Sequence, residues 1–353
     1  MLMHSNCTRK IKRVKTNYKE RDIFFEKRTQ SNVEYSVKFV KFERSNVVHK
    51  WVGAQMIHNS IYFIPNDEER VLMYGNCPEY YECKKCGEFK WTGGCVWNGS
   101  VFGFPRSANS FLKITNNHIE EIPLSIVYNK EHHYSGVCCE NGIVYQPPRN
   151  TNHILKTDLK TGISEQIDIV DAKYGINFRY CGSIIHPNGF IYFFPENGKV
   201  IKLDPELDKW SFIGKRVSTM CFDAKIGNDG NIYGFSAYNN GIMKINVKYN
   251  TVEMIHKEFA PKAYGTKYGI DGWLYSIPGD GAKIWKYNID DDIVEEVFDL
   301  KDSSKAKYAG GVTLQNGKIV CVPATASSIL ILEPNCEGVI PDGMYSKYIN
   351  DNY

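Results

Sequence analysis

The sequence has no run of about 18 apolar residues, which is the length that a membrane-spanning helix needs. Its N-terminus lacks the apolar stretch of a secretory signal peptide, and its 11 cysteines are an odd number. We therefore expect a cytoplasmic protein that has mostly reduced thiols and does not associate with membranes. The net charge of +3 is too small to indicate nucleic-acid binding by the whole chain. Any positively charged site must be local.

Familiar catalytic motifs are also missing. The sequence contains no nucleophile elbow, Walker phosphate loop, dinucleotide-binding fingerprint or His-Glu-x-x-His motif. Motifs alone therefore assign no reaction to this chain.

The N-terminal segment is basic. Between residues 9 and 21 seven basic side chains accompany one acidic side chain, Glu20. We predict that residues 1–32 form a tail, which is either solvated or an arm that binds nucleic acid or an acidic surface.

A turn dipeptide recurs along the chain at intervals of 40, 43, 47, 41, 42 and 45 residues. Its seven copies are His58-Asn59, Asn98-Gly99, Asn141-Gly142, Asn188-Gly189, Asp229-Gly230, Asp271-Gly272 and Asn316-Gly317. Six of them are Asn-Gly or Asp-Gly, which readily adopt the positive φ angles of a two-residue hairpin turn. In six copies a proline follows seven residues after the first member, where a strand can end. Short apolar strands follow, so each copy reads as a four-stranded unit.

Four short antiparallel strands at this spacing predict an all-β fold, a seven-bladed β-propeller. The copies begin near Trp51, Trp91, Tyr134, Tyr180, Phe222, Tyr264 and Tyr308. The last copy ends after its third strand near Glu333, while residues 33–39 alternate apolar and polar before the first copy. We predict that this N-terminal strand completes the last blade and closes the ring. The predicted propeller covers residues 33–336, and residues 337–353 form a C-terminal tail.

The repeat is similar to that of known propellers. Gly189-Phe190-Ile191-Tyr192, followed by Val200-Ile201-Lys202-Leu203-Asp204, resembles the sugar-lactonase and streptogramin-lyase type of seven-bladed propeller. The repeat lacks the Trp-Asp signature and the kelch spacing. Because this fold carries many unrelated functions, the resemblance implies the fold and no catalytic residues.

Basic residues gather near the start of the predicted first strands, which line the central channel of a propeller. Each copy begins with an aromatic residue, which we call its opening aromatic. The residues directly before the opening aromatics are Lys50, Lys90, His133, Arg179, Cys221, Ala263 and Lys307. Lys225 and Lys267 follow four residues later in adjacent blades, on the same strand face, and Arg106 and Arg149 begin loops on the same side.

We predict a ligand site in this funnel, formed by Lys50, Lys90, Arg106, His133, Arg149, Arg179, Lys225, Lys267 and Lys307. Converging cations repel one another, which favours a bound phosphate, nucleotide, carboxylate or nucleic-acid backbone. The alternative is a solvated rim, partly neutralised by Glu68, Glu69, Glu196 and Asp280. We expect the opening aromatics to pack between blades.

Four cysteines interrupt the repeat, namely Cys77, Cys83, Cys86 and Cys95. Cys83-Lys84-Lys85-Cys86-Gly87 has the spacing of a zinc-binding turn, so a structural zinc is the one cofactor that the sequence suggests. A redox or disulfide role and plain reduced thiols are the alternatives.

The functional hypothesis is a module that binds an anionic small molecule or a phosphorylated partner in the funnel. The first alternative is a lyase or hydrolase that acts on a small anionic substrate there, with His133, Lys225 or Lys267 transferring a proton. The second alternative is a protein-interaction scaffold. We expect a monomer, with nucleic acid as a further partner if the basic tail binds it.

Overall fold

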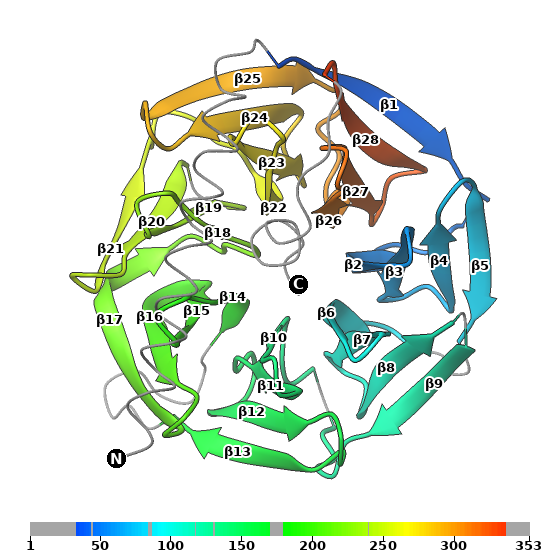
Figure 1. Ribbon diagram of the computed structural model, residues 1–353, viewed down its shortest axis with the longest axis vertical. Helices are drawn as coiled ribbons and strands as arrows, with labels where there is room; N and C mark the ends of the chain where they lie inside the picture. Colours follow the sequence, from blue (N-terminus) through cyan, green and yellow to red (C-terminus); the bar gives the residue numbers. More distant parts are fainter. Residues whose placement is uncertain are drawn as a thin grey trace.

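Seven four-stranded antiparallel sheets surround a central axis in the computed structural model (Figure 1). The structure describes residues 33–336 except 44, 84–86, 117, 130, 170–178 and 239. The predicted all-β, seven-bladed β-propeller is confirmed. No described segment forms a helix long and apolar enough to cross a membrane.

In blades 1 to 6 the strands follow chain order from the axis outward. Blade 1 holds β2 (Trp51–Ile57), β3 (Ser60–Pro65), β4 (Arg70–Tyr74) and β5 (Pro78–Glu82). Blade 2 holds β6 (Trp91–Trp97), β7 (Ser100–Pro105), β8 (Ser110–Thr115) and β9 (His118–Pro123). Blade 3 holds β10 (Val137–Cys138), β11 (Ile143–Gln146), β12 (His153–Asp158) and β13 (Ser164–Asp168). Blade 4 holds β14 (Tyr180–Ile185), β15 (Ile191–Pro195), β16 (Asn197–Asp204) and β17 (Lys209–Ser218).

The remaining blades include the closure of the ring. Blade 5 holds β18 (Lys225–Ile226), β19 (Ile232–Phe235), β20 (Ile242–Asn246) and β21 (Thr251–Ile255). Blade 6 holds β22 (Ala263–Tyr268), β23 (Leu274–Pro278), β24 (Lys283–Asn288) and β25 (Ile293–Asp299). Blade 7 holds β26 (Tyr308–Thr313), β27 (Ile319–Pro323), β28 (Ser328–Pro334) and, as its outer strand, β1 (Tyr35–Lys41).

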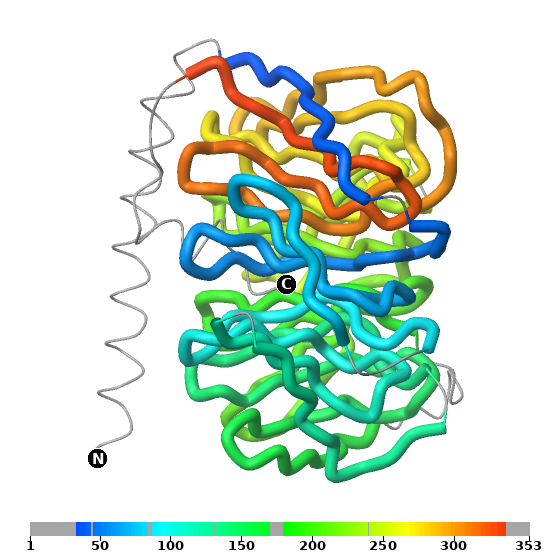
Figure 2. The backbone as a smooth tube through the Cα atoms, turned by 90° about the vertical axis from the view of Figure 1, so that its right-hand side faces the viewer, coloured from blue at the N-terminus to red at the C-terminus, as the bar shows by residue number. Residues whose placement is uncertain are grey.

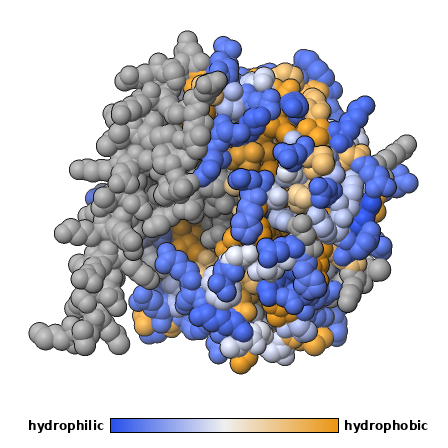
Figure 3. All heavy atoms as spheres, turned by 45° about the vertical axis from the view of Figure 1, so that its right-hand side comes forward, coloured by the Kyte–Doolittle hydropathy of each residue, from blue (hydrophilic) through white to orange (hydrophobic). Residues whose placement is uncertain are grey.

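The outer strands separate the core from solvent. The outer strands β21 and β25 contain several exposed residues, whereas all residues of β15, β23 and β27 are buried. The visible described surface is mainly hydrophilic, with apolar residues showing between the polar ones (Figure 3). The core therefore lies between the blades, as expected when each sheet buries its faces against its neighbours.

The N-terminal strand closes the ring, as the sequence predicts. β1 pairs antiparallel with β28 from Tyr35 opposite Pro334 to Lys41 opposite Ser328, and the two strands run side by side in Figure 2. The Tyr35 hydroxyl donates to the carbonyl oxygen of Gly317 at 3.0 Å and accepts from the backbone N–H of Ile270 at 2.8 Å.

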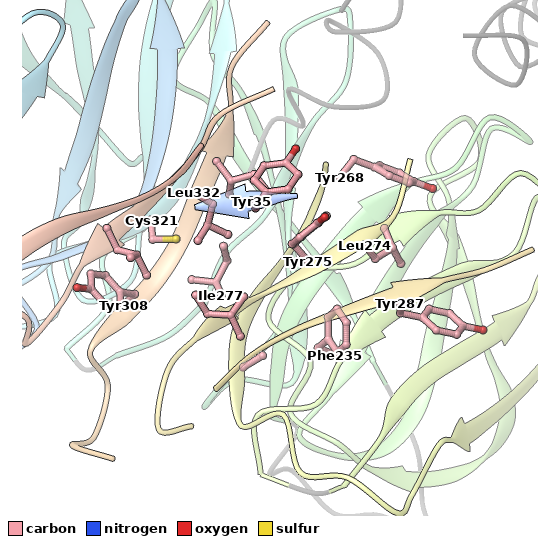
Figure 4. Packing of buried hydrophobic residues seen from close by; sticks show 14 of the residues in the cluster. Tyr35, Phe235, Tyr268, Leu274, Tyr275, Ile277, Tyr287, Tyr308, Cys321 and Leu332 are labelled. Atoms are coloured by element: carbon pink, nitrogen blue, oxygen red, sulfur yellow. The ribbon is translucent and has the colours of Figure 1, made fainter. Parts of the chain in front are cut away.

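The Tyr35 ring extends the same contact into the core. It packs against Tyr275 with ring centroids 4.6 Å apart, close to Leu332 (Figure 4). Because Tyr275 belongs to blade 6 and Leu332 to blade 7, β1 joins these two blades as well as the two ends of the ring.

We expect Tyr35→Phe to lower the free energy of unfolding by about 1–3 kcal/mol, because it leaves two buried backbone groups without their partner. Urea unfolding followed by fluorescence measures the change. Tyr249→Phe is the matched control, since the Tyr249 ring is 67% exposed. Equal stability of the two variants would show that the Tyr35 hydroxyl does not hold the closure.

Candidate functional site

The opening aromatics fall into two groups. Trp51, Trp91, Tyr180 and Tyr308 pair with the proline that ends the second strand of their blade, and all four are buried. The indole N–H of Trp51 donates at 2.8 Å, and that of Trp91 at 2.7 Å, to a backbone carbonyl of the same blade. These four aromatics pack in the core, as the sequence suggests.

The opening aromatics of blades 3, 5 and 6 lie on the channel wall instead. In blades 3 and 6 the residue opposite the proline is the one directly before the opening aromatic, namely His133 and Ala263. Successive residues of a strand point to opposite faces, so a slip of one residue turns Tyr134 and Tyr264 toward the axis. Phe222 of blade 5 lines the same channel, and all three rings are half-buried.

The spacing in the sequence gives no signal for this slip. Tyr134 and Tyr264 stand fourteen residues before the proline that ends the second strand, and so do the buried Trp51 and Trp91. The phase of these inner strands is therefore seen only in the structure.

The three rings form a continuous row, which we call the aromatic wall (Tyr134, Phe222 and Tyr264). The ring centroids of Tyr134 and Phe222 lie 5.6 Å apart, and those of Phe222 and Tyr264 lie 5.0 Å apart. Blades 7, 1 and 2 face this row from the other side of the axis (Figure 1). Together they line one cavity.

Three glycines, which we call the glycine wall (Gly53, Gly93 and Gly310), lie on the facing side of the cavity beside Val52, Thr92 and Ala309. The φ angles of the three glycines are +81°, +61° and +80°, a region that side-chain-bearing residues rarely adopt. A Cβ added at Gly53 would lie 2.6 Å from the Gly93 Cα atom. The inner strands thus approach backbone to backbone here, and only glycine fits.

Lys225 and Lys267 meet at the channel wall, as their spacing in adjacent blades predicts. Lys225 Nζ lies 3.0 Å from one carboxylate oxygen of Asp223, and Lys267 Nζ lies 2.7 Å from the other. All three side chains are buried. The sequence prediction did not include Asp223, although its position two residues before Lys225 places it on the same strand face.

The carboxylate between the two lysines stays ionised. Burial opposes the charged form of Asp223, but the nearby ammonium groups of Lys225 and Lys267 lower its pKa below the ordinary value. We call Lys225, Asp223 and Lys267 the Lys-Asp-Lys cluster.

A second cluster surrounds Tyr134. Glu131 accepts from Arg106 Nε at 2.8 Å and from Arg149 Nε at 2.6 Å. Both guanidinium groups lie over the Tyr134 ring, at 4.6 and 4.8 Å from its centroid. Burial opposes ionisation of Glu131, yet the charges of the two arginines lower its pKa. Here, too, two cations share one carboxylate.

Glu196 extends this cluster toward solvent. Its carboxylate lies 3.8 Å from Arg149 and 4.0 Å from Arg179, whose side chain is 58% exposed. The Arg149 Nη1 atom and the Glu196 Oε2 atom are buried without a hydrogen-bond partner among the described residues. We call Arg106, Glu131, Arg149, Arg179 and Glu196 the arginine cluster, and their charges sum to +1.

Three of the predicted funnel lysines lie apart from this site. Lys90 Nζ donates to two backbone carbonyl oxygens at 2.9 and 3.1 Å, and Lys307 Nζ donates to two others at 3.0 and 2.9 Å. Lys50 is buried, and burial lowers its pKa while Glu68 opposes that effect. The structure does not bring these three ammonium groups to the Lys-Asp-Lys cluster.

His133 lies in the blade interior, within a group of buried aromatic side chains. Its Nδ1 atom lies 2.8 Å from that of His132, and its ring centroid lies 5.3 Å from that of His153. Burial, with smaller contributions from the charges of His132 and His153, lowers the pKa of His133 well below its usual value. His133 is therefore neutral and is not part of the channel lining.

The cysteines proposed as zinc ligands are spread over separate regions. Cys77 is exposed, and Cys83 and Cys95 belong to different hydrophobic clusters. Burial raises the pKa of Cys83 to about 12, which disfavours the thiolate that zinc binds. Cys86 lies outside the described residues. Within the part of the chain that the structure describes, no three His, Cys, Asp or Glu side chains form a group that could hold a metal ion.

No protein-family model and no curated protein matches this chain. Solved structures do resemble it. A streptogramin B lyase structure has a TM-score of 0.68 and 14% identity over 85% of this chain and 98% of that chain. A catalytically inactive variant of virginiamycin B lyase from Staphylococcus aureus with quinupristin has a TM-score of 0.69 and 16% identity, over 85% and 99%. At these identities the likeness establishes the fold alone.

The buried histidines predict a pH-dependent stability. A histidine whose pKa is lowered on folding binds protons more readily in the unfolded chain, where its pKa is about 6.5. Acidification from about pH 7.5 to about pH 5.5 should therefore lower the free energy of unfolding, by up to about 1.4 kcal/mol per histidine and pH unit.

Urea unfolding at the two pH values tests this. His133 faces His132, His153 and Tyr128, and of these neighbours His153 also has a pKa lowered chiefly by burial, opposed by Asp168. We expect the free energy of unfolding of His133→Gln to fall less on acidification than that of the wild type. His118→Gln, which removes an exposed imidazole, is the control. An unchanged loss in His133→Gln would exclude His133 as a source of the effect.

Proposed function

We propose that this protein binds a small anionic molecule, or an anionic group of a larger partner, in the channel between the aromatic wall and the glycine wall. The observation that carries the proposal is the Lys-Asp-Lys cluster. Lys225 and Lys267 share the single carboxylate of Asp223 in a buried position beside the cavity.

Burial strengthens the interaction of this cluster with a charged ligand. The attraction between opposite charges grows as water is excluded. Lys267 lines the cavity, so an anion in the channel would lie beside its ammonium group.

The arginine cluster would favour the same kind of ligand. Three guanidinium groups accompany two carboxylates there, and Arg179 projects into solvent. Positive charge at the mouth of a narrow site raises the local concentration of anions and their association rate.

The similar lyase structures raise an enzyme that acts on a small anionic substrate as the second candidate. The acid–base groups in the channel favour binding instead. The pKa of Asp223 is lowered, and burial raises the pKa of both Tyr264 and Cys181. A general acid or base works best with a pKa near the operating pH, and these three groups are moved away from it.

Isothermal titration calorimetry at low ionic strength, with inorganic phosphate, pyrophosphate and adenosine 5′-monophosphate as probes, tests the proposal. We expect binding of at least one probe. Lys267→Met should weaken that binding by about tenfold or more, about 1.4 kcal/mol, because it removes the ammonium group that lines the cavity. Lys225 keeps Asp223 paired in this variant, so the fold should persist.

Lys156→Met is the matched control. It also removes a lysine from an ion pair, here with Asp208 and Glu165 near the outside of blade 3. Wild-type affinity in Lys156→Met together with weak binding in Lys267→Met supports the proposal. Absence of binding of every probe, or equal affinity in the two variants, refutes it.

A further inference from the structure

The aromatic wall presents an apolar surface beside a cationic group. Phe222 is its central ring, with Tyr134 and Tyr264 on either side at 5.6 and 5.0 Å. Each of the three rings lines the cavity and is half-buried, so part of each ring is available to a ligand. The Phe222 side chain has no polar atom, and its contribution to binding is therefore apolar contact and ring stacking.

The glycine wall limits the shape of what can lie opposite these rings. At Gly53 the inner strands leave no space for a Cβ, and a Cβ at Gly310 would lie 3.2 Å from the Gly53 Cα atom. A cavity with half-buried rings on one side, and glycines with the short side chains of Val52, Thr92 and Ala309 on the other, suits a flat group that contacts both sides. A small aliphatic anion would leave the rings uncovered.

The charged groups lie at the edge of the aromatic wall. Asp223 directly follows Phe222, and it places the ammonium group of Lys267 beside the cavity. At the other end of the row, the guanidinium groups of Arg106 and Arg149 cover the Tyr134 ring. A ligand that covers Phe222 can therefore extend a negative group toward a cation on either side.

We infer that the channel selects anions that carry a flat aromatic ring, with the ring on the aromatic wall and the acidic group at the Lys-Asp-Lys cluster. This inference rests on the proposed function and names the class of anion. Aryl phosphates and aromatic carboxylates share this chemistry, and the two are separate arms of the test.

The test compares probes that differ in one feature. Phenyl phosphate and methyl phosphate have the same charged group, benzoate and acetate form the carboxylate pair, and benzyl alcohol has the ring without the charge. We expect calorimetry to show at least tenfold tighter binding of the aromatic member in one of the two pairs, and no detectable binding of benzyl alcohol.

Phe222→Leu tests the wall itself, because leucine retains apolar volume and removes the ring. The preference for the aromatic member should fall to about threefold or less in this variant. Phe298→Leu, at a ring that is 40% exposed on β25, should retain it. Unfolding curves show whether each variant is folded, and Tyr264→Leu replaces Phe222→Leu if the latter is not.

The outcomes separate this inference from the proposed function. Equal binding of the two members in both pairs, with loss of binding in Lys267→Met, overturns the aromatic preference and leaves the anion site. The inferred selection of aromatic anions is also overturned if Phe222→Leu keeps the full preference for the aromatic member, or if benzyl alcohol binds tightly. Failure of every anion to bind refutes both proposals.

Discussion

Closure of the ring is the constraint on which the rest of this structure depends. β1 and β28 come from opposite ends of the propeller and pair over seven residues, and Tyr35 ties blade 6 to blade 7 through two buried hydrogen bonds. A propeller blade cannot bury both faces alone, so seven blades must pack side by side around one axis. Every residue near that axis then has neighbours from blades that are distant in the chain.

The narrow centre of the ring explains why the channel is asymmetric. Blades 7, 1 and 2 meet through glycines whose backbones touch, since a Cβ added at Gly53 would come within 2.6 Å of the Gly93 Cα atom. Blades 3, 5 and 6 instead turn Tyr134, Phe222 and Tyr264 toward the axis. In blades 3 and 6 a shift of one residue in strand phase produces this difference, because side chains alternate between the two faces of a strand.

Cations near the channel have two different roles, and their partners distinguish them. Lys90 and Lys307 donate to backbone carbonyls of neighbouring loops, so their charge supports the packing of adjacent blades. Lys225 with Lys267, and Arg106 with Arg149, share one carboxylate per pair. The shared carboxylates hold like charges close together, and the proposed anion site beside the aromatic wall rests on this arrangement.

The sequence by itself determined the number of blades, the four strands of each blade and the strand that closes the ring. These features follow from local chemistry, since Asn-Gly and Asp-Gly turns and the alternation of residues 33–39 act within a few residues. It also indicated that Lys225 and Lys267 converge. Only the tertiary structure decided that Asp223 lies between them, that Glu131 joins Arg106 to Arg149, and that His133 is enclosed in a blade. Pairing across blades and the phase of each inner strand depend on how the whole ring packs, which no local pattern specifies.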